Sequence, residues 1–180
     1  AEAIKHALIA DGELLGRFEA QADALLALDP RATTEVIARS IAIKARIVGE
    51  DEREEAGLRT VLNYGHTLGH ALESATEYVS FLHGEAVAVG MMAAAEIGQR
   101  AGITPPPLVE RQRRLLERFG LPTRAPGMPL AAVRQAMALD KKVRGGALRW
   151  VLLEDVGRPV VRSDVPLEVV EEALASVLGG

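Results

Sequence analysis

Residues 63–70 read Asn63-Tyr64-Gly65-His66-Thr67-Leu68-Gly69-His70, and residues 82–85 read Leu82-His83-Gly84-Glu85. These two stretches hold three of the four histidines in the chain. Histidine is the side chain best suited to bind a divalent metal or to move a proton near neutral pH. His66 and His70 are four positions apart, so on a helix they share one face, and His83 lies where a second helix is predicted to begin. The clustering favours a metal or acid–base site carried by helices.

Apolar residues recur at helical spacing through most of the chain. We therefore predict a mainly α domain of seven to eight helices with one small β-hairpin, forming a single unit over residues 1–180. Asp29-Pro30 is a strong helix start, with Asp as the cap and Pro at the first helical position. The hairpin is predicted from residues 147–153 and the return at residues 160–161. The predicted helices cover residues 1–10, 13–28, 31–48, 62–77, 84–100, 108–119, 130–139 and 165–178.

Composition narrows the class of protein. The 180 residues are 48% hydrophobic, which is enough for a real core. The net charge of −4 and the aromatic content of 3% argue against nucleic-acid binding, which needs a basic surface and stacking side chains. No apolar run reaches the roughly 18 residues of a membrane span, and the sequence contains no cysteine. We expect no signal peptide. We expect a cytoplasmic enzyme, and the helical start without methionine suggests a piece of a longer protein.

Two histidines and one carboxylate, with coordination positions left open, would suit Zn²⁺ or a similar divalent ion acting as a Lewis acid. His66 and His83 are the natural imidazole ligands, whereas His70 could be a third ligand or an acid–base residue. The spacing leaves the carboxylate open among Glu2, Glu73 and Glu85. The alternative is that the histidines cap helices or hydrogen-bond inside the core, which the clustering disfavours.

Glycines and cations surround the histidines. Gly65, Gly69 and Gly84 each cost a helix about 1 kcal/mol relative to alanine, so they imply either ligand binding or close helix packing. Each cation taken alone could be a surface charge. If the cations converged with the single asparagine, the site would suit an anionic, oxygen-rich substrate. This set comprises Lys5, Lys44, Arg59, Lys141, Lys142 and Asn63.

The longer motifs resemble one known family. The chain begins Ala1-Glu2-Ala3-Ile4-Lys5, continues with Gly57-Leu58-Arg59-Thr60-Val61-Leu62 directly before the Asn63–His70 stretch, and later carries Asp140-Lys141-Lys142. Together with residues 82–91, these segments resemble the C-terminal domain of the 3-dehydroquinate synthases. The resemblance runs from residue 1 to about residue 160. It implies the helical C-terminal domain of that family, with an N-terminal NAD-binding α/β domain outside this chain.

The resemblance also implies roles for individual residues. Glu2, His66 and His83 would bind a divalent metal, Zn or Co, and His70 would be a polar residue near the substrate. The family converts a seven-carbon keto-acid sugar phosphate to 3-dehydroquinate and phosphate, through transient oxidation by bound NAD, phosphate elimination, reduction, ring opening and aldol closure. A homodimer is also implied. The implied substrate-binding residues are Lys5, Lys44, Arg59, Asn63 and one of Lys141 and Lys142.

The sequence leaves three alternative functions open. A sister sugar-phosphate cyclase, such as a 2-deoxy-scyllo-inosose synthase, would share the metal set. A metal-dependent alcohol or glycerol dehydrogenase of the same fold would present an Asp and more histidines to the metal. A non-catalytic helical interaction domain would bind no metal.

Overall fold

The computed structural model describes residues 1–51, 57–77, 79–143 and 148–179, with the side chains of residues 139–143 excepted. The described part is mostly helical with one antiparallel hairpin, which confirms the predicted fold class. No described helix is both long and apolar enough to cross a membrane. In chain order the elements are α1 (Glu2–Ala10), α2 (Gly12–Ala20), α3 (Ala22–Leu26), α4 (Pro30–Glu50), the 3₁₀ helix η1 (Leu58–Asn63), α5 (His66–Ala75), α6 (His83–Arg100), α7 (Pro106–Arg118), α8 (Leu130–Val143), β1 (Trp150–Asp155), β2 (Arg158–Arg162) and α9 (Leu167–Leu178).

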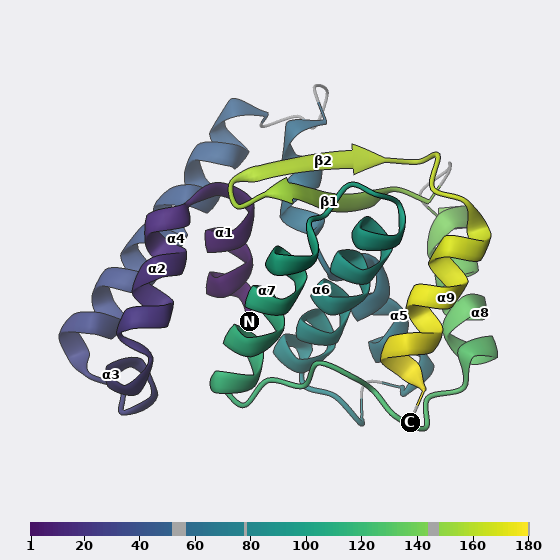
Figure 1. Ribbon diagram of the computed structural model, residues 1–180, viewed down its shortest axis with the longest axis horizontal. Coiled ribbons are helices and arrows are strands. Elements are labelled where there is room, and N and C mark those ends of the chain that lie inside the picture. The colour runs from purple at the N-terminus through teal and green to yellow at the C-terminus, as the bar shows by residue number, and fades with distance from the viewer. Residues whose placement is uncertain (52–56, 78, 144–147, 180) are drawn as a thin grey trace.

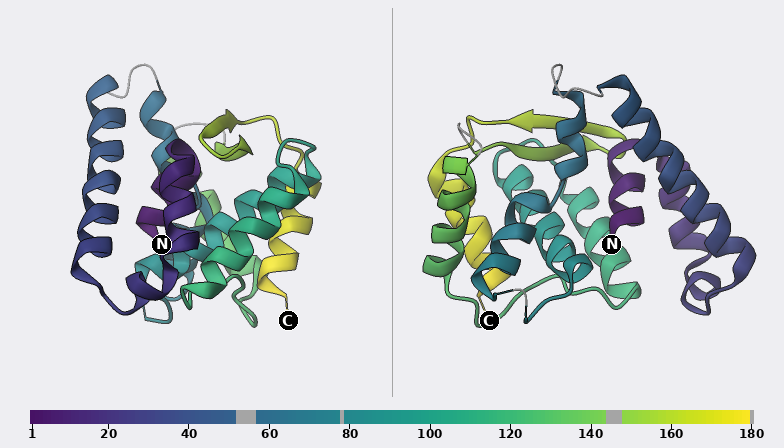
Figure 2. Two further views of the ribbon diagram at one scale, coloured as in Figure 1. Left: turned by 60° about the vertical axis from the view of Figure 1, so that its left-hand side comes forward. Right: turned by 180° about the vertical axis from the view of Figure 1, so that it is seen from behind.

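Helix α6 is the centre of the domain (Figure 1). It contacts α1, α5, α7, α9 and β1. Every residue from Ala86 to Ala95 is buried, because this stretch carries small or apolar side chains on all sides of the helix. Helices α2, α3 and α4 form a layer outside α1, and α4 stands at the edge of the molecule in both views of Figure 2.

Helix starts follow the predicted chemistry in the N-terminal layer. Asp29 caps α4, because its Oδ1 accepts a hydrogen bond from the Ala32 amide at 2.8 Å, and Pro30 takes the first position. The predicted helix over residues 13–28 is divided into α2 and α3 by a turn at Gln21. This turn lets α3 pack against α4.

The hairpin covers one end of the helices. Trp150 pairs with Arg162 and Leu152 with Val160, and the first four residues of β1 are buried. Gly157 adopts a positive φ of 74° at the turn, and its amide donates to the Leu8 carbonyl of α1 at 2.8 Å. The hairpin prediction is confirmed, and the turn fixes the far end of α1.

Helices α5 and α6 cross so closely that only glycine fits between them. A Cβ at Gly90 would lie 1.9 Å from the carbonyl oxygen of Gly65, and one at Gly65 would lie 2.7 Å from the Met91 amide. Gly65 also has a φ of 80°, which favours glycine. Close helix packing therefore accounts for Gly65, whose position fixes the start of α5.

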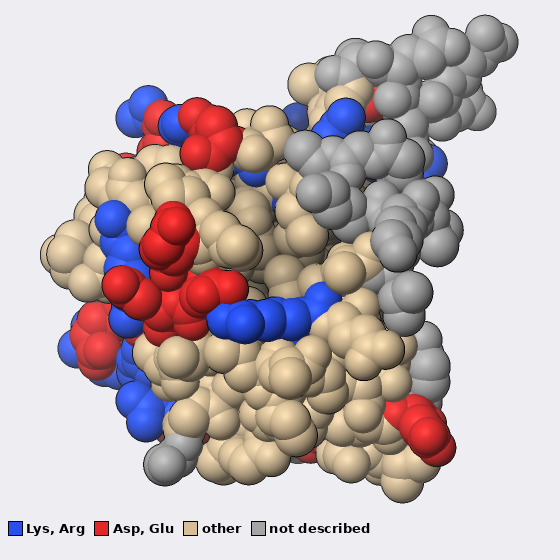
Figure 3. Space-filling view, turned by 90° about the vertical axis from the view of Figure 1, so that its right-hand side faces the viewer, with Lys and Arg blue, Asp and Glu red and all other residues tan. Residues whose placement is uncertain are grey.

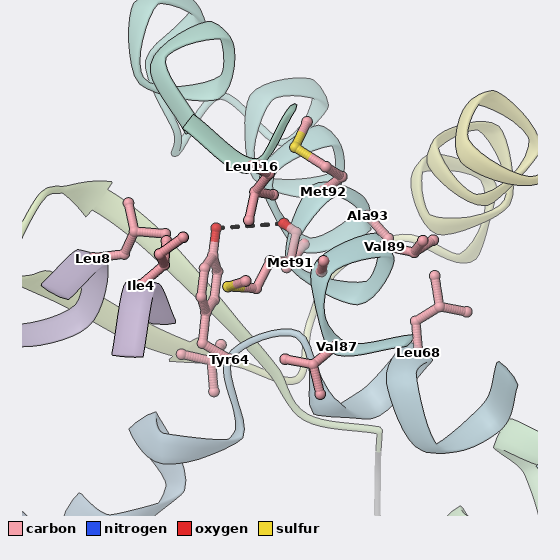
Figure 4. Close-up of a cluster of buried hydrophobic side chains, with 14 of the residues drawn as sticks. Ile4, Leu8, Tyr64, Leu68, Val87, Val89, Met91, Met92, Ala93 and Leu116 are labelled. Carbon is pink, nitrogen blue, oxygen red and sulfur yellow. Dashed lines mark hydrogen bonds between the residues drawn. The ribbon is translucent and has the colours of Figure 1, made fainter. Parts of the chain in front are cut away.

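A buried tyrosine, Tyr64, also holds the residues just before His66 in place (Figure 4). Tyr64 is fully buried between α1 and α6, and its hydroxyl donates to Oε1 of Gln112 at 2.7 Å. Gln112, on α7, in turn donates to the Met91 carbonyl at 2.9 Å. A buried polar group costs stability unless it is paired, and here each partner satisfies the next. The residues just before His66 are thus held from α6 and α7 together.

Charges on the face formed by α8 and α9 are mixed. Acidic and basic side chains lie next to one another there (Figure 3), and Arg134 pairs with Glu171 at 2.7 Å. The part of this face that the structure describes carries no extended basic patch of the kind that attracts nucleic acid.

Candidate metal centre

Three helices begin at one point in the structure, and each contributes its first residue. Glu2 starts α1, His66 starts α5 and His83 starts α6. Oε1 of Glu2 lies 3.2 Å from Nε2 of His66 and 3.6 Å from Nε2 of His83. One ligand atom from each residue lies within 4.8 Å of the other two. Two imidazoles and one carboxylate at this separation can hold one divalent ion.

The far nitrogen of each imidazole is already engaged. Nδ1 of His66 lies 3.2 Å from the carbonyl oxygen of Tyr64, which can only accept, and Nδ1 of His83 lies 2.9 Å from Oε1 of Glu73. Both contacts favour the tautomer in which Nδ1 carries the proton. The lone pair of each Nε2 then faces Glu2. Metal-binding histidines have such partners in proteins, and the partners set the orientation of the ring.

Glu2 itself has one oxygen satisfied and one not. Lys5 donates to Oε2 at 2.8 Å, whereas Oε1 is buried and has no hydrogen-bond partner within the described residues. Burial alone would raise the pKa of Glu2, but the hydrogen bond and positive charge of Lys5 oppose it, and the pKa lies well below its usual value. A buried, ionised and unpartnered oxygen facing two imidazoles fits a cation site.

The other two carboxylates left open by the sequence have different tasks. Glu73 is buried and supports His83, as described above. Glu85 lies in the first turn of α6 and accepts a hydrogen bond from the Leu82 amide at 2.9 Å, which caps the helix. The geometry therefore favours Glu2 as the carboxylate next to the two imidazoles.

A cavity of about 440 Å³ opens beside this triad. It brings together residues from α1, α4, η1, α5 and α6, which are distant in sequence. Lys5 is almost fully buried, and burial lowers its pKa, an effect that Glu2 partly opposes and Lys44 reinforces. The lining residues are Glu2, Lys5, His6, Lys44, Arg59, Leu62, Asn63, His66 and His83.

Comparison with known proteins gives the chain a family. The family model described as 3-dehydroquinate synthase C-terminal matches residues 1–143. The chain belongs to this family. It is 47% identical over 178 residues to the 3-dehydroquinate synthase of Halorhodospira halophila, and 49% identical over 175 residues to that of Azotobacter vinelandii. These matches cover 99% and 97% of this chain but 50% and 47% of the relatives, so the chain spans about half of their length.

Solved structures agree on the fold. A 2-epi-5-epi-valiolone synthase from Streptomyces hygroscopicus subsp. jinggangensis, with NAD⁺ and Zn²⁺ bound, matches 98% of this chain and 49% of its own, at 26% identity and a TM-score of 0.87. A 2-deoxy-scyllo-inosose synthase complexed with carbaglucose-6-phosphate, NAD⁺ and Co²⁺ matches 98% of this chain and 51% of its own, at 25% identity and a TM-score of 0.75.

The residues predicted for a 3-dehydroquinate synthase site divide into three groups. Lys5, Lys44, Arg59 and Asn63 line the cavity, together with the three predicted ligands. The ring of His70 lies against the triad, with its centroid 5.3 Å from that of His66 and 6.3 Å from that of His83. The side chains of Lys141 and Lys142 lie outside the described residues, so their predicted contacts are not tested.

Sequence reasoning missed two features of this site. The spacing indicates Glu73 only as a candidate ligand, whereas in the structure it contacts Nδ1 of His83. His6, the fourth histidine, was not considered although it lines the same cavity. Its position directly after Lys5 was the available signal, but the contact that orients it comes from Ser40, 34 positions away.

Proposed function

We propose that this chain is the metal- and substrate-binding half of a 3-dehydroquinate synthase. The complete enzyme would convert 3-deoxy-arabino-heptulosonate 7-phosphate to 3-dehydroquinate and phosphate, a carbon–oxygen lyase reaction of the shikimate pathway and aromatic amino acid biosynthesis. The family match and the named relatives support this assignment. Because the chain spans about half the length of these relatives, we assign NAD binding to an N-terminal α/β domain of the complete enzyme, outside these 180 residues.

The observation that carries the proposal is the convergence of His66 and His83 on Oε1 of Glu2, which has no hydrogen-bond partner in the part of the chain that the structure describes. These residues would hold a divalent cation, Zn or Co, as bound in the two similar cyclase structures. When bound, the cation would polarise substrate oxygens and lower the pKa of hydroxyl groups next to it.

The remaining cavity residues suit the charges of this substrate. Lys5, Lys44 and Arg59 place three cationic side chains around the cavity, where they would bind the carboxylate and phosphate and stabilise the departing phosphate. Asn63 offers an amide that can both donate to and accept from hydroxyl groups. One of Lys141 and Lys142 would complete the anion site.

His70 has a different task in this proposal. It lies one helical turn after His66 and on the same face of α5, with its ring against both histidine ligands. An imidazole at this position can hydrogen-bond to a substrate oxygen and exchange a proton with it. We assign His70 to that role and not to the metal.

A sister sugar-phosphate cyclase is the second candidate, because both similar structures come from such enzymes. Sequence identity favours the first candidate, since the relatives named 3-dehydroquinate synthase are far more similar. Turnover of the full-length protein with 3-deoxy-arabino-heptulosonate 7-phosphate and with glucose 6-phosphate separates the two. Turnover of the second substrate alone would favour the sister enzyme.

The other two alternatives are disfavoured by the same site. A dehydrogenase of this fold would present an Asp and more histidines, whereas Glu2 is the carboxylate that meets the imidazoles. A helical interaction domain has no need of a buried, unpartnered carboxylate oxygen between two oriented imidazoles. We further propose that the full-length protein is cytoplasmic and that it forms a homodimer. Light scattering of the purified protein tests the homodimer.

Three single substitutions in the full-length protein test the assignment. His66→Ala and His83→Ala should each lose bound metal, measured by elemental analysis, together with turnover. His70→Ala should keep its metal and lose turnover by roughly 10²–10⁴-fold, the range for an acid–base residue. If His70→Ala empties the site instead, the division between ligand and non-ligand is wrong. If the wild-type protein carries no metal, the proposed function fails.

A further inference from the structure

The histidine outside the sequence cluster is buried in the wall of the same cavity. His6 lies on α1 directly after Lys5 and is 5% exposed. Its Nδ1 lies 2.6 Å from the hydroxyl oxygen of Ser40 on α4, which is itself buried. A buried pair of this kind joins α1 to α4 and fixes the orientation of the imidazole plane.

The hydrogen bond to Ser40 leaves one ring nitrogen for the cavity. Ser40 occupies Nδ1, and His6 is among the residues that line the cavity beside the triad. Nε2 is the only other polar atom of the ring. Since the serine hydroxyl carries one hydrogen, donation of that hydrogen to Nδ1 leaves the ring proton on Nε2.

The positive charges around His6 suit an anionic ligand. The positive charges of Lys5 on α1 and Lys44 on α4 act on the ring, as do Glu2 and His66 of the triad. Burial, followed by the charge of Lys5, lowers the pKa of His6 to about 4, so the ring is uncharged near neutral pH. An uncharged N–H that lines the same cavity as these lysines can donate to an anionic oxygen without adding a further buried charge.

We infer that His6 is a substrate-binding residue, whose Nε2–H, oriented by Ser40, donates a hydrogen bond to the anionic group that Lys5 and Lys44 hold in the cavity. The inference rests on the proposed function, which supplies the sugar-phosphate substrate. It deepens that function by adding an uncharged, directional donor to a set of cationic side chains. A directional donor selects among anions by shape, whereas lysines act as point charges.

Three substitutions of His6 in the full-length protein separate its two ring nitrogens. The amide nitrogen of glutamine reaches approximately the position of Nε2, whereas that of asparagine reaches approximately the position of Nδ1. His6→Phe keeps the ring shape and removes both nitrogens. The measurements are KM and kcat for 3-deoxy-arabino-heptulosonate 7-phosphate, bound metal by elemental analysis, and the melting temperature.

We expect His6→Phe and His6→Asn to raise KM by about tenfold, the effect of one lost hydrogen bond to a charged group. His6→Gln should return KM to within about threefold of the wild type, and kcat and bound metal should change little in all three. Ser40→Ala keeps the ring but removes its partner, and should raise KM by about threefold. Ser40→Ala and His6→Gln carry the test if His6→Phe does not fold.

Two results would overturn the inference. If His6→Asn restores KM and His6→Gln does not, His6 serves only to join α1 to α4 through Ser40. If the variants lose metal, or if KM stays unchanged in an active enzyme, His6 does not bind substrate. Failure of the proposed function looks different, because the wild type itself would then lack metal or turnover.

Discussion

The imidazole of His66 is held by a main-chain carbonyl, whereas that of His83 is held by a carboxylate side chain. The His66 side chain is 13% exposed and that of His83 is 50% exposed. A carbonyl cannot be removed by substitution or titrated, so the orientation of His66 depends on the fold around residues 64–65. The orientation of His83 depends on one side chain. The two proposed ligands should therefore be lost for different reasons, His66 through packing and His83 through a change in one side chain.

Gly90→Ala should displace His66 because the added Cβ clashes with the segment before it. The added Cβ would lie 1.9 Å from the Gly65 carbonyl, so the residues before His66 must shift. We expect the free energy of unfolding to fall by about 3 kcal/mol, measured by chemical denaturation, with weaker metal binding. Gly16→Ala is the matched control, since a Cβ there meets nothing within 4 Å. Equal stability of Gly90→Ala and wild type would contradict the close helix crossing.

Glu73→Gln should break the His83 side without harming the fold. The amide keeps the size of the side chain but lacks the charge that supports His83. We expect metal affinity to fall by about 10–100-fold, the usual effect of losing such a partner, with a small change in stability. Glu85→Gln is the control, because Glu85 caps α6 and does not support either imidazole. Similar losses of affinity in both variants would show that the effect does not come from the contact between Glu73 and His83.

Gln112→Leu tests how far the orientation of His66 depends on the buried network. It removes a hydrogen-bond partner of the Tyr64 hydroxyl but leaves the Tyr64 carbonyl, which contacts His66, in place. The Tyr64 hydroxyl can still reach the Met91 carbonyl at 3.5 Å, so part of the lost pairing is recovered. We expect a loss of about 1–2 kcal/mol in unfolding free energy and less than threefold in metal affinity. Gln99→Leu, at an exposed position of α6, should change stability by no more than about 0.5 kcal/mol. A large loss of metal affinity in Gln112→Leu would show that the carbonyl contact needs the buried network.

His6 is held by a third kind of partner, the hydroxyl of Ser40. Unlike the two proposed ligands, it also gives a prediction about pH. Its pKa is about 4 in the folded protein against 6.5 for the free side chain. The unfolded chain therefore binds the proton first, and stability decreases as the pH falls from about 6.5 toward 4. The slope is at most about 1.4 kcal/mol per pH unit. His6→Asn should flatten this decline relative to wild type at equal metal concentration, and parallel curves would contradict the assignment.

The sequence predicted those features whose cause is local. The spacing of His66 and His70, the start of α6 at His83 and the hairpin after Arg149 all follow from neighbouring residues, and the structure has each of them. The turn at Gln21 was not predicted, because it depends on packing of α3 against α4. The carboxylate was open on spacing alone, since Glu2 reaches the histidines through tertiary structure. His6–Ser40 and Glu73–His83 were missed for the same reason.

The three proposed ligands are each the first residue of a different helix. Helices α5 and α6 are already fastened to one another by the glycine crossing. Helix α1 instead packs against α2 and α4 of the outer layer. An ion bound at this point would link the outer layer to the core. Its removal should quicken hydrogen exchange along α1 and α4 while leaving the amides of α6 protected.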